Sequence, residues 1–236
     1  MLWVRYIGLR RHLQVHQTTV AMNAVKTPIP EGIIHLSDEE RQDPASVILE
    51  LFSMSSLTDW RMDLWQYLKA ATAKLGWVML SQPGDAVFLQ RMLERLMECC
   101  WMLLQEKEAR DGEVELPAFA PFSGEWQADE RQRRLEHDAV HLAHGGKICL
   151  LRQRELDNPC LVLKAFFETM PLRRWKHLLS EWTEYALRRT SLFEETENYD
   201  LLVHYEQLEK LLEAAYILKK QVLEKGTRLN HQGDES

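Results

Sequence analysis

Three histidines with helical spacing are the residues of this sequence best suited to chemistry. His137, His141 and His144 lie at positions i, i+4 and i+7 of the stretch RRLEHDAVHLAHGG, residues 133–146. On an α-helix they fall within roughly 60° of one another. Imidazoles at i and i+4 can share a divalent metal ion. One hypothesis is therefore a metal-dependent enzyme that uses these histidines, with Glu130 or a residue from the second half of the chain as the fourth group.

A second interpretation makes the histidine stripe a surface. The apolar residues of the same helix gather on its opposite side and are expected to face the core: Leu135, Ala139, Leu142 and Ala143. The histidines then face solvent, a groove or a partner chain. The segment His137-Asp138-x-x-His141 has the spacing of the zincin motif HExxH, but Asp is one methylene shorter than Glu and would reach a metal-bound water less well. We therefore favour the surface interpretation.

A basic corner on the segment 171–189 offers another contact region. Arg173, Arg174 and Lys176 surround Trp175, and Trp182 follows seven residues later. Basic and aromatic residues together can mark a nucleic-acid interface, here with Arg188 and Arg189 added. The two tryptophans share one helical side, however, which favours core packing, and the net charge of −7 argues against nucleic acid. The corner Arg173, Arg174 and Lys176 is predicted to contact a protein.

Motifs for catalysis are missing from the sequence. It has no glycine-rich phosphate loop, no GxSxG elbow and no CxxC pair among its four cysteines, which we interpret as reduced core thiols. No apolar run reaches the roughly 18 residues of a membrane span. The sequence therefore favours a cytoplasmic, non-catalytic binding or regulatory protein that needs no cofactor and acts on a protein partner or by self-association, with no role for a membrane.

Apolar periodicity predicts an all-α bundle of about six to eight helices. Asp43-Pro44 suits a helix start, and further helices are expected over about 58–74, 85–110, 128–144, 171–189 and 200–225. Cys149–Glu155 is also expected to be helical. No segment alternates as a strand does.

The chain also resembles itself. Asn158-Pro159 matches Asp43-Pro44 at a shift of 115 positions, and the match continues through core residues: Phe167 with Phe52, Leu172 with Leu57, Trp175 with Trp60, and Leu179 with Leu64. With one extra residue of shift, the last helix overlays the 85–110 helix, placing Leu212 on Leu96. Apolar matches come easily between helices, but the Pro and Trp matches do not follow from periodicity. This predicts two pseudo-repeated three-helix units, about 43–110 and 158–225.

The predicted domain organisation follows from these elements. Residues 1–36 form a basic leader and a proline-containing loop, in which residues 1–21 resemble either a transit peptide or an over-extended start before Met22. A single helical domain covers 37–226. It consists of a first half over 37–110, a linker over 111–126, a connecting helix over 127–146 and a second half over 156–226. Residues 227–236 are expected to be a disordered tail.

Overall fold

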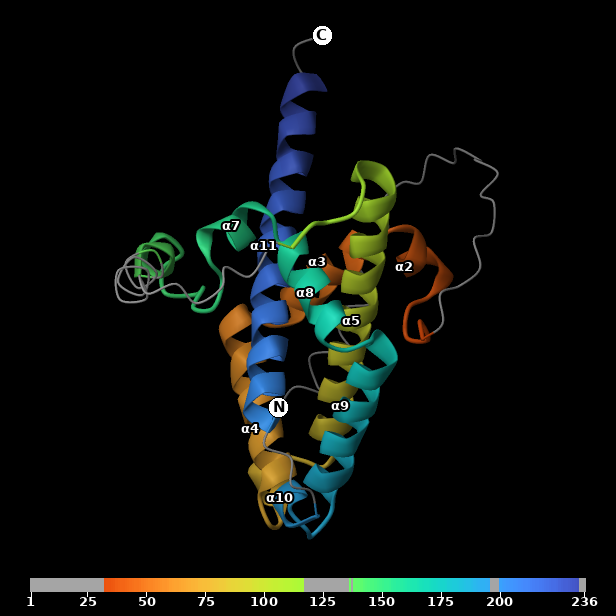
Figure 1. Ribbon diagram of the computed structural model, residues 1–236, viewed down its shortest axis with the longest axis vertical. Coiled ribbons are helices and arrows are strands. Elements are labelled where there is room, and N and C mark those ends of the chain that lie inside the picture. Colours follow the sequence, from red (N-terminus) through yellow and green to blue (C-terminus); the bar gives the residue numbers. More distant parts are fainter. Residues whose placement is uncertain (1–31, 117–135, 137, 196–199, 234–236) are drawn as a thin grey trace. The chain divides into compact units, whose positions relative to one another are not determined.

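The computed structural model describes residues 32–116, 136, 138–195 and 200–233. Its contacts divide the chain into a unit Met1–Ile33 and a unit Ile34–Ser236, and the second unit carries the fold. Every regular element in the described ranges is a helix, and no strand occurs in them (Figure 1). The predicted all-α class is confirmed.

The first half contains α2 (Asp38–Gln42), α3 (Pro44–Met54), α4 (Leu57–Thr72), the 3-10 helix η2 (Gly76–Met79) and α5 (Gly84–Asp111). Local sequence explains the starts. Ser37 and Glu40 form a capping box before α2, and Ser56 and Asp59 form another before α4. Pro44 begins α3, where a missing N–H has no cost.

The second half contains α7 (Gln153–Asp157), α8 (Cys160–Thr169), α9 (Leu172–Leu187), α10 (Leu192–Glu195) and α11 (Leu201–Gly233). The bounds of α9 agree with the predicted helix to within two residues. α11 extends to Gly233, past the predicted end of the domain at 226. Residues 227–233 are thus helical, where a disordered tail was expected.

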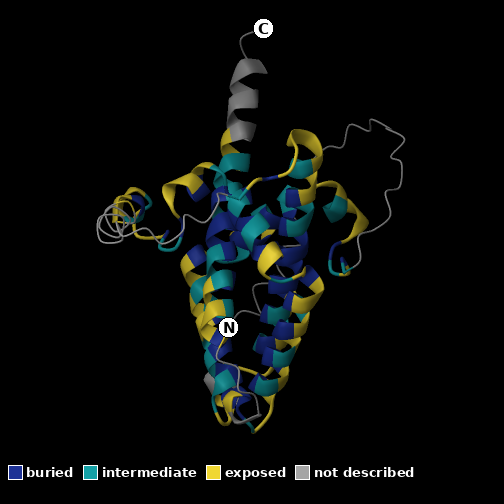
Figure 2. Cartoon of the chain, in the orientation of Figure 1, coloured by how far each residue is buried: buried dark blue, intermediate teal, exposed yellow. Residues whose placement is uncertain are grey.

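Helices of the two halves pack across one another. α4 lies against α9 at the centre, α5 packs on α9, and α11 packs on α4. α3 and α8 each contact both long helices, α5 and α11 (Figure 1). The buried residues line these contacts (Figure 2), and they include Trp175 and Trp182, which are fully buried as predicted. The last long helix of each half, α5 or α11, therefore packs against helices of both halves.

The same side-chain contacts occur in both halves, 115 positions apart. The indole N–H of Trp60 donates to the Leu51 carbonyl at 3.2 Å, and that of Trp175 donates to the Phe166 carbonyl at 3.2 Å. Arg95 of α5 pairs with Glu40, as Lys210 of α11 pairs with Glu155. The α5 and α11 contacts thus recur at 115 positions, so the extra residue of shift predicted for the last helix is wrong.

Candidate interaction surfaces

A fully buried carboxylate on α5 holds the chain segment that precedes α2. The Glu98 oxygens accept hydrogen bonds from the backbone N–H groups of Ile34 at 3.0 Å, His35 at 2.8 Å and Leu36 at 3.1 Å. Glu98 also forms an ion pair with Lys176 of α9. Three N–H donors and one cation replace the water that the buried carboxylate has lost, and they offset the free-energy cost of its desolvation.

A second buried carboxylate, on α11, does the same for the segment before α7. The Glu213 oxygens accept from the N–H groups of Cys149 at 2.8 Å, Leu150 at 2.9 Å and Leu151 at 3.1 Å. Arg61 of α4 supplies the cation. Every partner lies 115 positions from its counterpart around Glu98. The prediction that Cys149–Glu155 is helical is wrong over 149–152, since α7 begins at Gln153. The N–H groups of 149–151 bind Glu213 and not carbonyls of a preceding helical turn.

The predicted basic corner is smaller than its sequence suggested. Arg173 and Arg174 are exposed on α9, but the Lys176 side chain is only 11% exposed and is turned toward Glu98. Of the other two arginines, Arg188 pairs with Glu184 and Arg189 is exposed. Lys176 therefore has a structural partner, which sequence spacing could not reveal.

The histidine stripe lies partly outside the described residues. His137 and Glu130 belong to that part. His141 is half-buried, with Nδ1 3.1 Å from the Ile148 carbonyl and 3.5 Å from the Cys149 sulfur. His144 Nδ1 lies 3.4 Å from the Lys220 ammonium. Burial and then this positive charge lower the pKa of His144. A neighbouring ammonium also opposes binding of a second cation.

The apolar side of this segment does not face the core. Leu142 is 78% exposed, and Ala139 and Ala143 are exposed as well, whereas Val140 is buried. The expected orientation is therefore wrong for these three residues, and Leu135 lies outside the described residues. Gly145 and Gly146, both with positive φ, reverse the chain so that Ile148 and Cys149 return to His141. Tertiary hydrogen bonds set the orientation more strongly than the small apolar stripe.

Among the described residues, no group of three or more His, Cys, Asp and Glu side chains is arranged to hold a metal ion. The metal hypothesis requires His137 and stays a prediction. The four cysteines form no disulfide, and burial raises the pKa of the Cys99 and Cys100 thiols.

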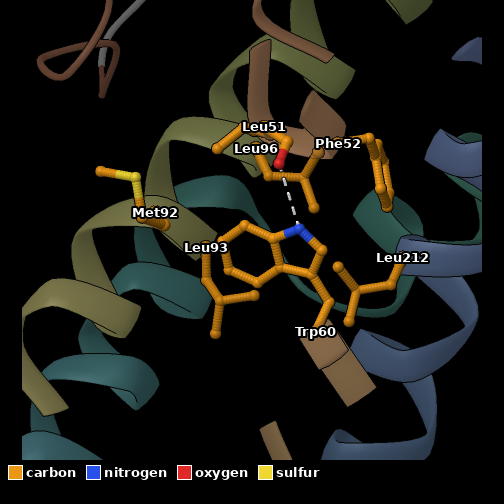
Figure 3. A pocket seen from close by; sticks show the side chains of 7 residues that line it. All are labelled: Leu51, Phe52, Trp60, Met92, Leu93, Leu96 and Leu212. Carbon is orange, nitrogen blue, oxygen red and sulfur yellow. Dashed lines mark hydrogen bonds between the residues drawn. The ribbon is translucent and has the colours of Figure 1, made fainter. Parts of the chain in front are cut away.

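An apolar pocket lies between the first-half helices and α11 (Figure 3). Its lining residues are Leu51, Phe52, Trp60, Met92, Leu93, Leu96 and Leu212. In the second half, Phe166 occupies the position of Leu51 and stacks on Trp175 with centroids 4.2 Å apart. Leu51 is smaller than Phe166, which accounts for the space beside Trp60. The pocket has no room for a water molecule, so it is a packing gap and not a ligand site.

An exposed aromatic face spans α4 and α11. Trp65 is 41% exposed and contacts Tyr205 edge-on, with ring centroids 5.5 Å apart, and Met62 is 58% exposed one turn earlier on α4. The Lys69 ammonium lies 5.9 Å from the Trp65 ring. We define Met62, Trp65 and Tyr205 as the aromatic face.

The corresponding face, between α9 and α5, is polar. His177, Ser180 and Gln90 stand 115 positions from Met62, Trp65 and Tyr205. Buried contacts recur in the two halves, but the aromatic residues occur only at the face between α4 and α11 and not at the equivalent face between α9 and α5. Sequence reasoning missed it because Trp65 lies outside the apolar stripe of its helix. A position-by-position comparison of the two halves would have identified it.

The Tyr205 hydroxyl is held as a neutral donor. Partial burial and then the negative charge of Glu209 raise the pKa of Tyr205 to about 12. Glu209 also pairs with Arg61 at 2.9 Å. The Tyr205 hydroxyl therefore stays protonated while its ring packs edge-on against Trp65.

In the part of the chain that the structure covers, no helix is both long and apolar enough to cross a bilayer. Comparison of the chain with known protein families, with curated proteins and with solved structures gives no match.

Proposed function

We propose that this chain is a cytoplasmic, non-catalytic binding protein that holds a protein partner on its aromatic face. The supporting observation is the difference between the aromatic face of α4 and α11 and the equivalent polar face of α9 and α5. The polar residues His177, Ser180 and Gln90 are compatible with the same helix packing, so folding does not require Met62, Trp65 and Tyr205. Exposed Trp and Tyr are enriched among the residues that contribute most to protein interfaces.

Acidic residues near the aromatic face indicate which charge the partner should carry. Glu206 is exposed next to Tyr205, and Asp63 follows Met62 on α4. Burial and then the negative charges of Asp59 and Asp85 raise the pKa of Asp63, so carboxylates are concentrated along this part of the molecule. A partner segment with an apolar anchor for the Trp65–Tyr205 pair and a neighbouring Lys or Arg fits this surface.

Site-specific photo-crosslinking tests the location. A photoreactive residue replaces Met62 in one variant and His177, the exposed equivalent position on α9, in the matched control. We expect a discrete crosslinked protein at position 62 and not at 177. The crosslinked protein is then purified and its affinity for the chain is measured directly.

Substitution of the anchor tests the energetics with that purified partner. Trp65→Ser copies the other half, and it should weaken binding by about 30-fold, or roughly 2 kcal/mol, as for a central interface tryptophan. Ser180→Ala is the control and should leave the affinity unchanged. Equal affinity of wild type and Trp65→Ser, or crosslinking of the same protein at both positions, would contradict the proposal.

A further inference from the structure

One end of the helix bundle exposes apolar side chains from several elements. There α4 and α9 end, η2 and α10 lie, and α5 and α11 begin, with the Ser191 hydroxyl of the second half bonded to the Thr72 carbonyl of the first (Figure 1). Six exposed residues define this apolar end: Leu75, Val78, Val87, Leu187, Phe193 and Leu202. Several large apolar residues exposed near one another mark an interaction surface more often than scattered single ones do.

Both halves contribute to the apolar end in the same way. Phe193 stands 115 positions after Val78, and Leu202 stands 115 positions after Val87. Val78 and Phe193 are each 60% exposed, and Val87 and Leu202 are 43% and 64% exposed. The aromatic face has a polar equivalent between α9 and α5, whereas both halves contribute exposed apolar residues to the apolar end. Exposed residues of the apolar end therefore recur at the same shift of 115 positions as the buried contacts.

Charged residues at this end also occur at equivalent positions of the two halves, as one basic pair and one acidic pair. Lys74 and Arg189 follow the ends of α4 and α9, and Asp85 and Asp200 stand at the starts of α5 and α11. Lys74, Arg189 and Asp200 are exposed, and Asp85 is half-exposed. Each half thus brings one cation and one anion beside its apolar residues. Such a surface can place acid against base when it meets a copy of itself.

We infer that two copies of this chain associate end to end through the apolar end, related by a two-fold axis. A self-complementary charge pattern distinguishes a second copy from a partner with one sign of charge. Leu75 supports an interaction role for this end. It has φ of 58°, a left-handed backbone that a leucine rarely adopts, and its side chain is 45% exposed. The core does not explain a leucine at this position.

Sedimentation equilibrium of the full chain over the micromolar range is the direct test. We expect a monomer–dimer equilibrium for wild type and a dissociation constant at least about tenfold higher for the double variant Val78→Glu/Phe193→Glu. Met62→Glu, on the aromatic face, is the matched control and should dimerise as wild type does. Circular dichroism checks that each variant is folded, and Leu75→Asn, which suits a left-handed backbone, is a milder variant that should also weaken the dimer.

Charge variants make the test reciprocal. The acidic variant Lys74→Glu/Arg189→Glu and the basic variant Asp85→Asn/Asp200→Lys should each self-associate less than wild type, and mixing them should restore a dimer. A wild type that stays monomeric at every concentration, or a dimer that Val78→Glu/Phe193→Glu leaves intact, would overturn the inference. A dimer lost only in Met62→Glu would overturn it too, since it would place self-association on the aromatic face. The Met62 crosslink to a different protein would be unaffected by loss of the dimer, so the two proposals fail separately.

Discussion

Lys176 on α9 forms an ion pair with the fully buried carboxylate of Glu98 on α5. The two residues belong to different halves of the chain. In the pair Arg61–Glu213 the cation comes from the first half and the buried carboxylate from the second. Each half thus supplies the cation that compensates the buried anion of the other. The two carboxylates also hold the segments that enter α2 and α7. Neither half can satisfy its own buried carboxylate alone.

Neutralising either carboxylate should therefore destabilise the whole domain. In Glu98→Gln and in Glu213→Gln, a cation remains partly buried without its anion, and the free energy of unfolding in urea should fall by about 3–5 kcal/mol in each. The two losses should be similar because the contacts are equivalent. Glu206→Gln, at an exposed position on the same helix as Glu213, should change stability by less than about 0.5 kcal/mol. A loss confined to one of the two buried sites would contradict the equivalence.

Gly76 is required by a close approach of two backbones. A Cβ atom at this position would lie 1.7 Å from the Ala70 carbonyl oxygen, so Gly76→Ala must shift either η2 or the end of α4. We expect a loss of about 2–3 kcal/mol or more in chemical denaturation. Gly84→Ala is the control, because a Cβ there meets nothing within 4 Å and alanine favours the helix that begins at Gly84. Similar effects of both variants would show that η2 tolerates the displacement.

Helix positions could be predicted from the sequence because their causes are local. Pro44, Ser56 and the apolar stripe of α4 lie within a few residues of the ends they define. The packing of α5 on α9 and of α11 on α4 depends on tertiary contacts between the halves, which the periodicity of a single helix does not encode. The orientation of Leu142 was mistaken for the same reason, since hydrogen bonds from the Cys149 N–H to Glu213 and from His141 Nδ1 to the Ile148 carbonyl fix that segment.

The candidate surfaces were harder to predict than the fold. Lys176 was expected at a contact surface because a charge on a helix usually faces solvent, but its partner Glu98 is 78 positions away in sequence. Trp65 was missed because a single tryptophan outside an apolar stripe has no periodic signal. Comparison with the equivalent residue Ser180 distinguishes Trp65, but this comparison requires the shift of 115 positions to be known.

A half-buried histidine should make stability depend on pH. His204 contacts the Trp175 ring edge-on with centroids 5.6 Å apart, and in the described part of the chain its buried Nδ1 has no hydrogen-bond partner. Burial chiefly, together with Arg174, lowers the pKa of His204, although Asp200 opposes the shift. The unfolded chain, with a histidine pKa of about 6.5, then binds the proton more readily. The contribution of His204 to stability is therefore fully present above about pH 6.5 and is lost as the pH falls below that value toward the lowered folded-state pKa.

Replacing this histidine by its counterpart should flatten that pH profile. Leu89, which is buried, occupies the position equivalent to His204. His204→Leu should lose less stability than wild type between pH values near 7 and 5, and His144, whose pKa is also lowered, should account for part of the dependence that remains. His177→Leu, at an exposed position on α9, should retain the wild-type dependence. An unchanged slope in His204→Leu would assign the pH dependence to other groups.

The last prediction concerns the histidine at the centre of the RRLEHDAVHLAHGG segment. His141 Nδ1 lies at hydrogen-bonding distance from the Ile148 carbonyl, and the neighbouring His144 faces the Lys220 ammonium. His141→Ala should therefore cost about 1 kcal/mol of stability, the value of one such hydrogen bond, without changing the metal content of the purified, untagged protein. Elemental analysis beside His177→Ala checks this. About one equivalent of zinc in wild type and in His177→Ala, absent from His141→Ala, would instead make His141 a metal ligand and restore the metal hypothesis.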